Sequence, residues 1–311
     1  MSARALAVLV VAAAACRSAR PVAQAQRAAA AEPVDAGPPA EARKGADAGP
    51  AEPPSDPLTA IDAAFARGEI DPAIAACEQA ALTATDPAPL LVRAARARRA
   101  RAGAALAGAD AAGLPSAARD AEACAADAHR AWSAQFPAAG AQVDGTHPAA
   151  EVYAQVGPAG AEALYLEALC SAEWARTQGF TQLVERRTEL LAALERAAQL
   201  APALDGAGPD RELGALYGAL PSYAGGDLAL ARRHFEAAAA RAPAVAANHL
   251  EYARAVAVKA QDRQLFEAEL KLAAATGDPA AAAQAAALLS REDDLFGPAE
   301  AAQPTPGGPL K

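Results

Sequence analysis

Residues 213–243 read LGALYGALPSYAGGDLALARRHFEAAAARAP, and this stretch decides the fold. Apolar residues recur at intervals of three and four on both sides of a central PSYAGG segment, which is the spacing of amphipathic helices. Proline and glycine interrupt helices, and the Asp227 that follows them is a preferred N-cap residue. We therefore expect a helix, a turn and a second helix. The apolar face of the second helix would consist of Leu228, Ala231, Phe235, Ala238 and Ala242.

The small and large apolar residues of this stretch resemble the tetratricopeptide repeat. Leu213, Gly214 and Tyr217 match the pattern of its first helix, and Ala231, Phe235, Ala238 and Pro243 match the pattern of its second. The two sets lie about five residues further apart than in an ordinary repeat. The excess is the loop before Asp227. The resemblance implies stacked helix pairs that form a binding scaffold.

The composition also favours helices. The chain has 311 residues, of which 53% are hydrophobic but only 4% aromatic, and alanine dominates the apolar share. Alanine has the highest helix propensity and little side-chain entropy to lose, whereas the alternating Val, Ile and Thr runs typical of strands are missing from the sequence. These features predict an all-α fold, with one compact solenoid-like domain of tetratricopeptide-like helix-turn-helix repeats over residues 58–296.

Local signals indicate where helices begin and end. Asp71-Pro72 predicts the start of an early helix, and Asp262 and Asp278 predict caps of two later ones. Residues 137–160 are rich in Gly and Pro. We expect a long irregular stretch there, of a kind that is often functional or disordered.

The net charge of −9 disfavours nucleic acid as a partner, because phosphates require a basic surface. The densest group of basic residues consists of Arg93, Arg96, Arg98, Arg99 and Arg101. A solvated helix face is favoured there over a site for phosphate or lipid headgroups.

Motifs that carry chemistry are missing from the sequence. It contains no HExxH, CxxC, P-loop or G-x-S-x-G pattern, and its four histidines are isolated from one another. The acidic run Glu292-Asp293-Asp294 is interpreted as a solvated helix end. We therefore expect no catalytic residues, no cofactor, no metal site and no enzymatic activity.

The first sixteen residues, MSARALAVLVVAAAAC, combine a positive start, a short apolar core and small residues that lead into Cys16. The apolar run is short for a transmembrane helix. The pattern resembles a bacterial lipoprotein signal that ends at a lipidated Cys16, and an ordinary secretory signal cut near Ala15 is the alternative. Arg17 after the cysteine favours the outer membrane over the inner one.

The segments on either side of the predicted domain have compositions that cannot bury a core. Residues 17–55 are rich in Ala, Pro, Gly and charge, and they predict a disordered tether with a reach on the order of 35 Å. Residues 297–311 predict a disordered tail.

Three further cysteines, Cys77, Cys124 and Cys170, have neither CxxC spacing nor a neighbouring metal ligand. We expect three small buried helix residues. A bridge between Cys77 and Cys124 is the less favoured alternative.

Several pairs and short runs resemble the TRAP transporter T-component family, also called TatT. They are Leu220-Pro221, Gly225-Gly226-Asp227, Ala231-Arg232, His234-Phe235, Tyr252-Ala253, Asp262, Leu265-Phe266, Asp293-Asp294-Leu295-Phe296, Ala163-Leu164-Tyr165 and Trp174. The resemblance covers about residues 160–296 and, more loosely, residues 58–136. It implies a periplasmic, lipid-anchored protein of tetratricopeptide-like helix pairs in the bacterial envelope. It also implies a role in a tripartite ATP-independent periplasmic transport system, beside its substrate-binding component.

Two hypotheses on function remain. In the first, a cleft between helix pairs binds a small organic acid or apolar ligand, lined by Tyr217, Tyr223 and Tyr252, and passes it to the substrate-binding partner. In the second, the protein is a scaffold for envelope assembly that binds only protein, as a monomer or a homo-oligomer. The structural alternative for the tyrosines is packing between repeats with one hydroxyl hydrogen bond. The Gly225-Gly226-Asp227 turn is interpreted as structural, since glycine permits positive φ and Asp caps the next helix.

Overall fold

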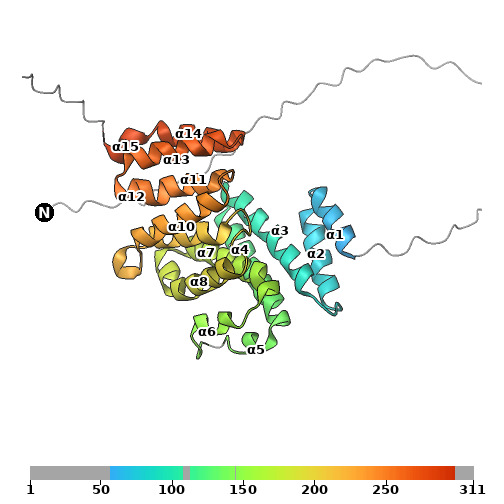
Figure 1. Ribbon diagram of the computed structural model, residues 1–311. Helices are drawn as coiled ribbons and strands as arrows, with labels where there is room; N and C mark the ends of the chain where they lie inside the picture. The colour runs from blue at the N-terminus through green and yellow to red at the C-terminus, as the bar shows by residue number, and fades with distance from the viewer. Residues whose placement is uncertain (1–56, 108–112, 144, 298–311) are drawn as a thin grey trace, which may run out of the picture.

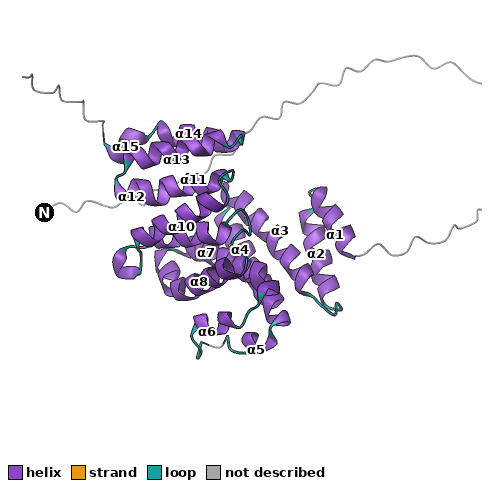
Figure 2. Ribbon diagram, viewed as in Figure 1, coloured by secondary structure: helices purple, strands orange, loops and turns teal. Residues whose placement is uncertain are grey.

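The computed structural model describes residues 57–107, 113–143 and 145–297. Every regular element in this part of the chain is helical (Figure 2), which confirms the all-α prediction. The predicted signal (residues 1–16), the predicted tether (residues 17–55) and all but the first residue of the predicted tail lie outside the described residues.

The helices follow one another with short connections. They are α1 (Pro57–Ala66), α2 (Ile70–Ala81), α3 (Ala88–Ala107), α4 (Leu114–Gln135), α5 (Pro137–Gly140), α6 (Ala149–Ala154), η1 (Pro158–Gly160), α7 (Ala161–Gln178), α8 (Phe180–Leu200), α9 (Gly208–Ala219), η2 (Ser222–Ala224), α10 (Leu228–Arg241), α11 (Ala246–Tyr252), η3 (Ala253–Ala257), α12 (Val258–Ala260), α13 (Arg263–Ala275), α14 (Pro279–Leu289) and α15 (Glu292–Phe296).

Each long helix packs mainly on its neighbours in the chain. The order of contact runs from α1 through α2, α3 and α4 to α7, α8, α9, α10, α11, α13 and α14. In Figure 1, α1 and α2 project to one side beyond α3, and α13 and α14 form the other end of the stack. Packing between successive helix pairs is the arrangement of a solenoid. It agrees with the solenoid-like repeats that the sequence predicts.

The pair α9–α10 owes its close packing to one glycine and one aromatic ring. A Cβ atom at Gly214 would lie 2.7 Å from Cδ2 of Phe235, so only glycine admits the ring at this distance. Phe235 is fully buried and stacks on Tyr252 of α11, with 5.4 Å between the ring centroids. Ala231 and Ala238 on the same face are also buried, as the periodicity predicts.

The turn before α10 is held by local contacts. Gly225 has φ +88°, and a Cβ atom at Gly226 would lie 1.9 Å from the backbone oxygen of Leu220. Oδ1 of Asp227 accepts hydrogen bonds from the backbone N–H groups of Ala229 and Leu230 at 2.9 and 3.0 Å. The carboxylate thereby satisfies two of the N–H groups that a helix start leaves unpaired.

Asp227→Ala is expected to lower the free energy of unfolding by about 1 kcal/mol, because the cap is lost while the turn glycines remain. Urea denaturation of the two proteins measures the difference. Ligand binding should be unchanged. A variant with wild-type stability that no longer binds ligand would contradict the structural role.

Two expectations on helix boundaries are wrong. α2 begins at Ile70, before Asp71-Pro72, and its first backbone bond runs from the N–H of Ala73 to the oxygen of Glu69. Pro72 is accommodated inside the helix because the N–H groups of the first turn have no partner within the helix. Residues 137–160 contain α5, α6 and η1, so this stretch is not wholly irregular.

The sequence predicts a solvated face for the arginines of α3. In the structure these arginines instead form ion pairs with four neighbouring helices. Arg93 pairs with Asp62, Arg96 with Glu162, Arg98 with Glu78 and Asp127, Arg99 with Glu173, and Arg101 with Asp71 and Asp120. The most buried of these pairs is Arg98–Asp127, whose side chains are 12% and 3% exposed. α3 is thus joined to α1, α2, α4 and α7 by charge.

The expectation of three unpaired cysteines is wrong for two of them. Cys124 on α4 and Cys170 on α7 form a disulfide, with 5.9 Å between their Cα atoms, and Cys77 is free and buried. The bridge joins two helices that pack directly on each other although α5 and α6 separate them in the chain. Because these intervening elements separate the two cysteines in the sequence, their spacing does not indicate the pair.

A buried charged pair joins α11 to α13. Nδ1 of His249 lies 2.7 Å from Oε2 of Glu269, and its Nε2 lies 3.0 Å from the backbone oxygen of Pro243. Both partners are acceptors, so both ring nitrogens donate only when the imidazole is protonated. The hydrogen bond to Glu269 is the main cause that raises the pKa of His249 above its ordinary value of 6.5.

This pair predicts a pH dependence of stability. Because the folded-state pKa is raised, the contribution of His249 is fully present below the unfolded pKa and is lost as pH rises through the folded pKa. We expect His249→Gln to destabilise the protein more at about pH 5.5 than at about pH 8.5. Urea unfolding of both proteins at the two pH values measures this. An equal difference at both would contradict the charged pair.

Candidate functional site

The three tyrosines suggested by the sequence do not surround one cleft. Tyr217 stacks on His234, with 5.8 Å between centroids, and its hydroxyl donates to Glu195 at 3.3 Å. Tyr252 is buried against Phe235, and its hydroxyl donates to Glu236 at 3.2 Å. These two border one apolar cluster, whereas Tyr223 on η2 is 86% exposed. None of the three lines the cavity between α7, α9 and η3. Their role in binding stays a prediction.

A cavity of about 560 Å³ opens between α7, α9 and the segment from α11 to α12. Four of its ten lining residues are small residues of α9 and η3, which leave room between the helices, and five are charged. The lining residues are Arg176, Glu212, Ala215, Gly218, Ala219, Glu251, Arg254, Ala255, Val258 and Lys259. The volume falls within the range of small-molecule sites in proteins.

A change of helix type shapes one wall of this cavity. Between α11 and α12 the chain forms η3, a π-helical turn of five residues. π-helical turns inside α-helices are often found at functional sites. η3 supplies Arg254 and Ala255 to the lining, and a Cβ atom at Gly218 of α9 would lie 3.1 Å from the backbone oxygen of Ala255. The two walls are therefore so close at this point that a side chain larger than that of glycine would require a small shift.

The cations of the cavity differ in what already binds them. Nζ of Lys259 donates to the backbone oxygens of Gly218 and Leu220 at 2.6 and 3.1 Å, which completes the end of α9. Arg254 donates to Glu251 at 2.9 Å and to Gln284 at 3.2 Å. Arg176, in the last turn of α7, is exposed and makes no hydrogen bond or ion pair with any residue of the described ranges. It is the cation of this cavity that is open to a ligand.

A second hollow, of about 270 Å³, lies on the other side of α7, toward α3. Its lining residues are Arg96, Arg99, Ala100, Gly103, Leu166 and Glu173. Nε of Arg99 donates to Oε1 of Glu173 at 3.2 Å, and Oε2 of Glu173 is buried without a hydrogen-bond partner in the described part of the chain. Burial is the largest cause that raises the pKa of Glu173; Glu212 adds to the shift, and Arg99 and Arg176 oppose it.

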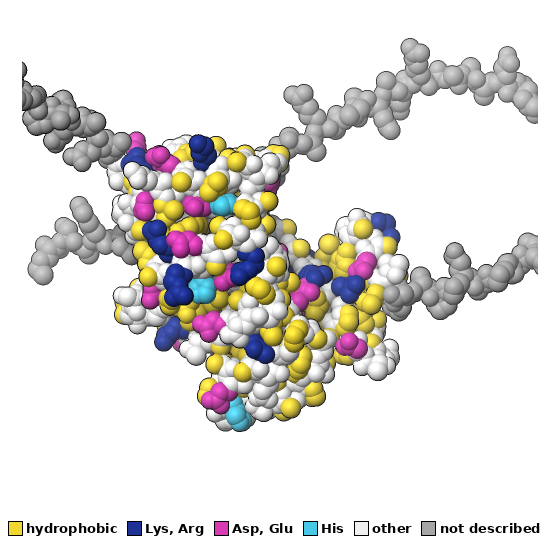
Figure 3. Space-filling model, in the orientation of Figure 1, with side chains coloured by type: hydrophobic (Ala, Val, Ile, Leu, Met, Phe, Trp, Pro, Cys, Tyr) yellow, Lys and Arg dark blue, Asp and Glu magenta, His cyan; other side chains and the backbone are white. Residues whose placement is uncertain are grey.

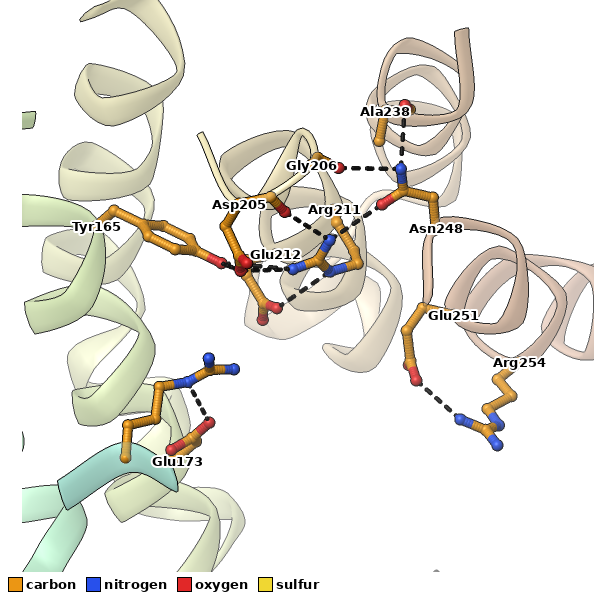
Figure 4. A network of polar contacts seen from close by, with 11 residues as sticks. Tyr165, Glu173, Asp205, Gly206, Arg211, Glu212, Ala238, Asn248, Glu251 and Arg254 are labelled. Carbon is orange, nitrogen blue, oxygen red and sulfur yellow. Dashed lines mark hydrogen bonds and ion pairs between the residues drawn. The ribbon is translucent and has the colours of Figure 1, made fainter. Parts of the chain in front are cut away.

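A buried polar network holds α9 against α7 and α11 (Figure 4). The hydroxyl of Tyr165 donates to Oδ2 of Asp205 at 2.8 Å. Arg211 donates to the same oxygen at 3.0 Å and to Oδ1 of Asn248 at 3.1 Å. Figure 4 shows Glu212 beside this network and Glu173 facing it from α7. The network sets the orientation of the α9 residues that line the cavity.

Charge on the surface is mixed. On the face shown in Figure 3, basic and acidic side chains are interspersed over α10 to α13 and do not form one patch. Within the described ranges no cluster of His, Cys, Asp and Glu has the grouping of a metal site. No helix of the described part is long and apolar enough to span a bilayer.

Sequence reasoning missed the charged residues of the α7–α9–η3 cavity. Arg176, Glu212 and Lys259 are isolated residues in alanine-rich helices, and their positions form no motif. Glu251 and Arg254 form a pair three residues apart, but such pairs occur on any exposed helix face. Only the stacking of α7, α9 and η3 brings these residues together.

Comparison with known proteins is consistent with this architecture. A family model described as TRAP transporter T-component matches residues 128–296, from the second half of α4 to the end of α15. No curated protein matches the chain. The matched span contains the α7–α9–η3 cavity, the η2 turn and Glu173. Because this match covers more than half of the 311 residues, the chain belongs to the TRAP transporter T-component family.

Proposed function

We propose that this T component assists the transport of a small organic acid, which it binds in the α7–α9–η3 cavity and exchanges with a substrate-binding protein of the same transport system. The family is a non-catalytic component that acts with a TRAP transport system in the bacterial envelope. The ligand, the partner and the binding site are the proposed parts.

The observation that carries the proposal is the charge of the cavity. Arg176, Arg254 and Lys259 face two carboxylates, so the lining has a net positive charge. Arg176 has no partner among the described residues, and the small apolar residues beside it can accommodate an alkyl chain. A monocarboxylate with a short apolar tail complements both features, whereas a purely apolar ligand would leave the arginine unpaired.

The proposed location is the periplasmic side of the envelope, with Cys16 as a lipid anchor and the outer membrane favoured over the inner one. The Cys124–Cys170 disulfide supports an oxidising compartment, because disulfides persist there and are rare in the cytosol. Cys16 lies outside the described residues. Mass spectrometry of the protein purified from membranes would identify acyl chains on that cysteine.

Binding of hexanoate and octanoate, measured by isothermal titration calorimetry, tests the cavity. Arg176→Gln is expected to weaken the Kd about tenfold or more, since a hydrogen bond to a charged group contributes about 1.5–3 kcal/mol. The matched control is Arg119→Gln on α4, an exposed arginine that does not line the cavity.

An unchanged Kd in Arg176→Gln would contradict the assignment of this cavity. Absence of binding by either carboxylate, combined with retained binding to a substrate-binding protein, would favour the protein-only scaffold.

A further inference from the structure

Two cavities flank α7, and each is lined by charged residues. Arg176 and Glu212 line the larger cavity, and Arg99 and Glu173 line the smaller one. The charges of Glu212 and Arg176 act on Glu173, and the charge of Glu212 also acts on Arg99. Because Arg176 follows Glu173 by three residues on α7, a ligand bound to Arg176 lies next to the smaller cavity.

Glu173 of the smaller cavity has an unsatisfied acceptor. Its Oε1 accepts from Arg99, and its Oε2 is buried with no partner among residues 57–107, 113–143 and 145–297. The side chain is 18% exposed, so water gives it little compensation. Buried polar atoms are almost always hydrogen-bonded, and one left without a partner is destabilising, the more so when it is charged.

The neighbours of Glu173 do not supply the missing donor. Arg99 donates to the other oxygen, Glu212 is an acceptor of like charge, and Arg176 acts on the carboxylate only through its charge. Glu173 is thus short of one hydrogen-bond donor, beside a cation that is free to bind a carboxylate.

We propose that Glu173 selects the ligand: its Oε2 accepts a hydrogen bond from a hydroxyl or ammonium group on the carbon next to the ligand carboxylate, while Arg176 binds the carboxylate itself. Glu173 and Arg176 are three residues apart on α7, which places their Cβ atoms about 5–6 Å from each other on the part of the helix between the two cavities. Two adjacent polar groups of one small molecule reach both side chains. The preferred ligands are therefore 2-hydroxy or 2-amino carboxylates, a class that refines the organic acid of the proposed function and rests on it.

The test compares three probes that differ only at one carbon: hexanoate, 2-hydroxyhexanoate and 2-aminohexanoate. Isothermal titration calorimetry of the wild-type protein is expected to give a Kd about tenfold lower for the two substituted acids, because each forms an additional hydrogen bond to a charged group. Glu173→Gln places an amide N–H₂ group where the acceptor oxygen lies. The variant should bind 2-aminohexanoate with the Kd of hexanoate, because neither an ammonium nor an amide N–H₂ group can accept a hydrogen bond. The hydroxyl of 2-hydroxyhexanoate can accept from the amide, so 2-aminohexanoate is the probe for this variant.

Glu185→Gln on α8 is the matched control, since Glu185 is exposed and lines neither cavity. It should keep the preference. Thermal unfolding of Glu173→Gln reports whether the variant is folded, and the comparison of probes on the wild-type protein is decisive without it.

Equal affinity of the wild-type protein for all three acids would overturn the role of Glu173 and leave the cavity proposal intact. Retained preference for 2-aminohexanoate over hexanoate in a folded Glu173→Gln variant would do the same. If none of the three acids binds, both this proposal and the proposed function fail.

Discussion

Removal of the Cys124–Cys170 disulfide is expected to lower the free energy of unfolding by about 4 kcal/mol. The bridge closes a loop across a sequence separation of 46 residues, and a cross-link of this size restricts the unfolded chain by about that amount in the chain-entropy account. The folded state also depends on it locally, because both cysteines are fully buried where α4 packs on α7. The effect is a large fraction of the stability of an ordinary domain.

Guanidinium denaturation of Cys124→Ala/Cys170→Ala and of the wild-type protein measures the loss. Cys77→Ala is the control, because Cys77 is buried but free. Reductant should shift the wild-type midpoint toward that of the double variant and leave the double variant unchanged. Coincident midpoints for the wild-type protein and the double variant without reductant would show that the bridge contributes nothing.

The second large effect is expected for Asp127→Ala. Asp127 on α4 is 3% exposed and pairs with Arg98 and Arg130. Breaking a buried ion pair by removing one partner typically costs about 3–5 kcal/mol, since the remaining charge stays buried without compensation. Here that charge is Arg98, which is 12% exposed and, among the described residues, keeps only the half-exposed Glu78 as a partner.

The same denaturation experiment measures this loss, with Asp62→Ala as the matched control. Asp62 also pairs with an arginine of α3 but is 52% exposed, and its removal should change the midpoint far less. Arg98→Met combined with Asp127→Leu should recover much of the stability, because an apolar pair leaves no buried charge. A double variant as unstable as Asp127→Ala would contradict this explanation.

The helix pairs could be predicted from the sequence because their signals are local. Asp262 accepts a hydrogen bond from the backbone N–H of Leu265 and Asp278 from that of Ala280, at 3.0 and 2.8 Å, so each cap lies within three residues of its partner. The α9–α10 pair is predicted by a periodicity that lies wholly within residues 213–243. Such contacts need no knowledge of which helices meet.

The disulfide and the arginine pairs could not be predicted because they join distant segments. Arg98 and Asp127 are 29 residues apart, Cys124 and Cys170 are 46 apart, and Arg99 and Glu173 are 74 apart. The sequence of the arginine run does not indicate whether the side chains are solvated or form ion pairs with other helices. The acidic partners, one or two from each neighbouring helix, form no pattern of their own.

The candidate site was missed for a related reason. Tyrosines attract attention in a chain poor in aromatic residues, yet Tyr217 and Tyr252 pack between helices. The charged residues that line the cavity come from α7, α9, α11, η3 and α12, and no two of these elements supply a recognisable motif. The π-helical form of η3 has no sequence signature in this alanine-rich stretch either.

Because of the π-helical turn η3, the shape of the cavity depends on the number of residues in this turn more than on the identity of their side chains. A π-helical turn contains one residue more than the α-helical turn it replaces. Deletion of a single residue within residues 253–257 would restore regular α-helix and rotate α12 by about 100° relative to α11. Val258 and Lys259 would then turn away from α9, and the bonds from Lys259 to Gly218 and Leu220 would be lost. In an alignment of this family, a one-residue gap at this turn would therefore identify members that lack the cavity.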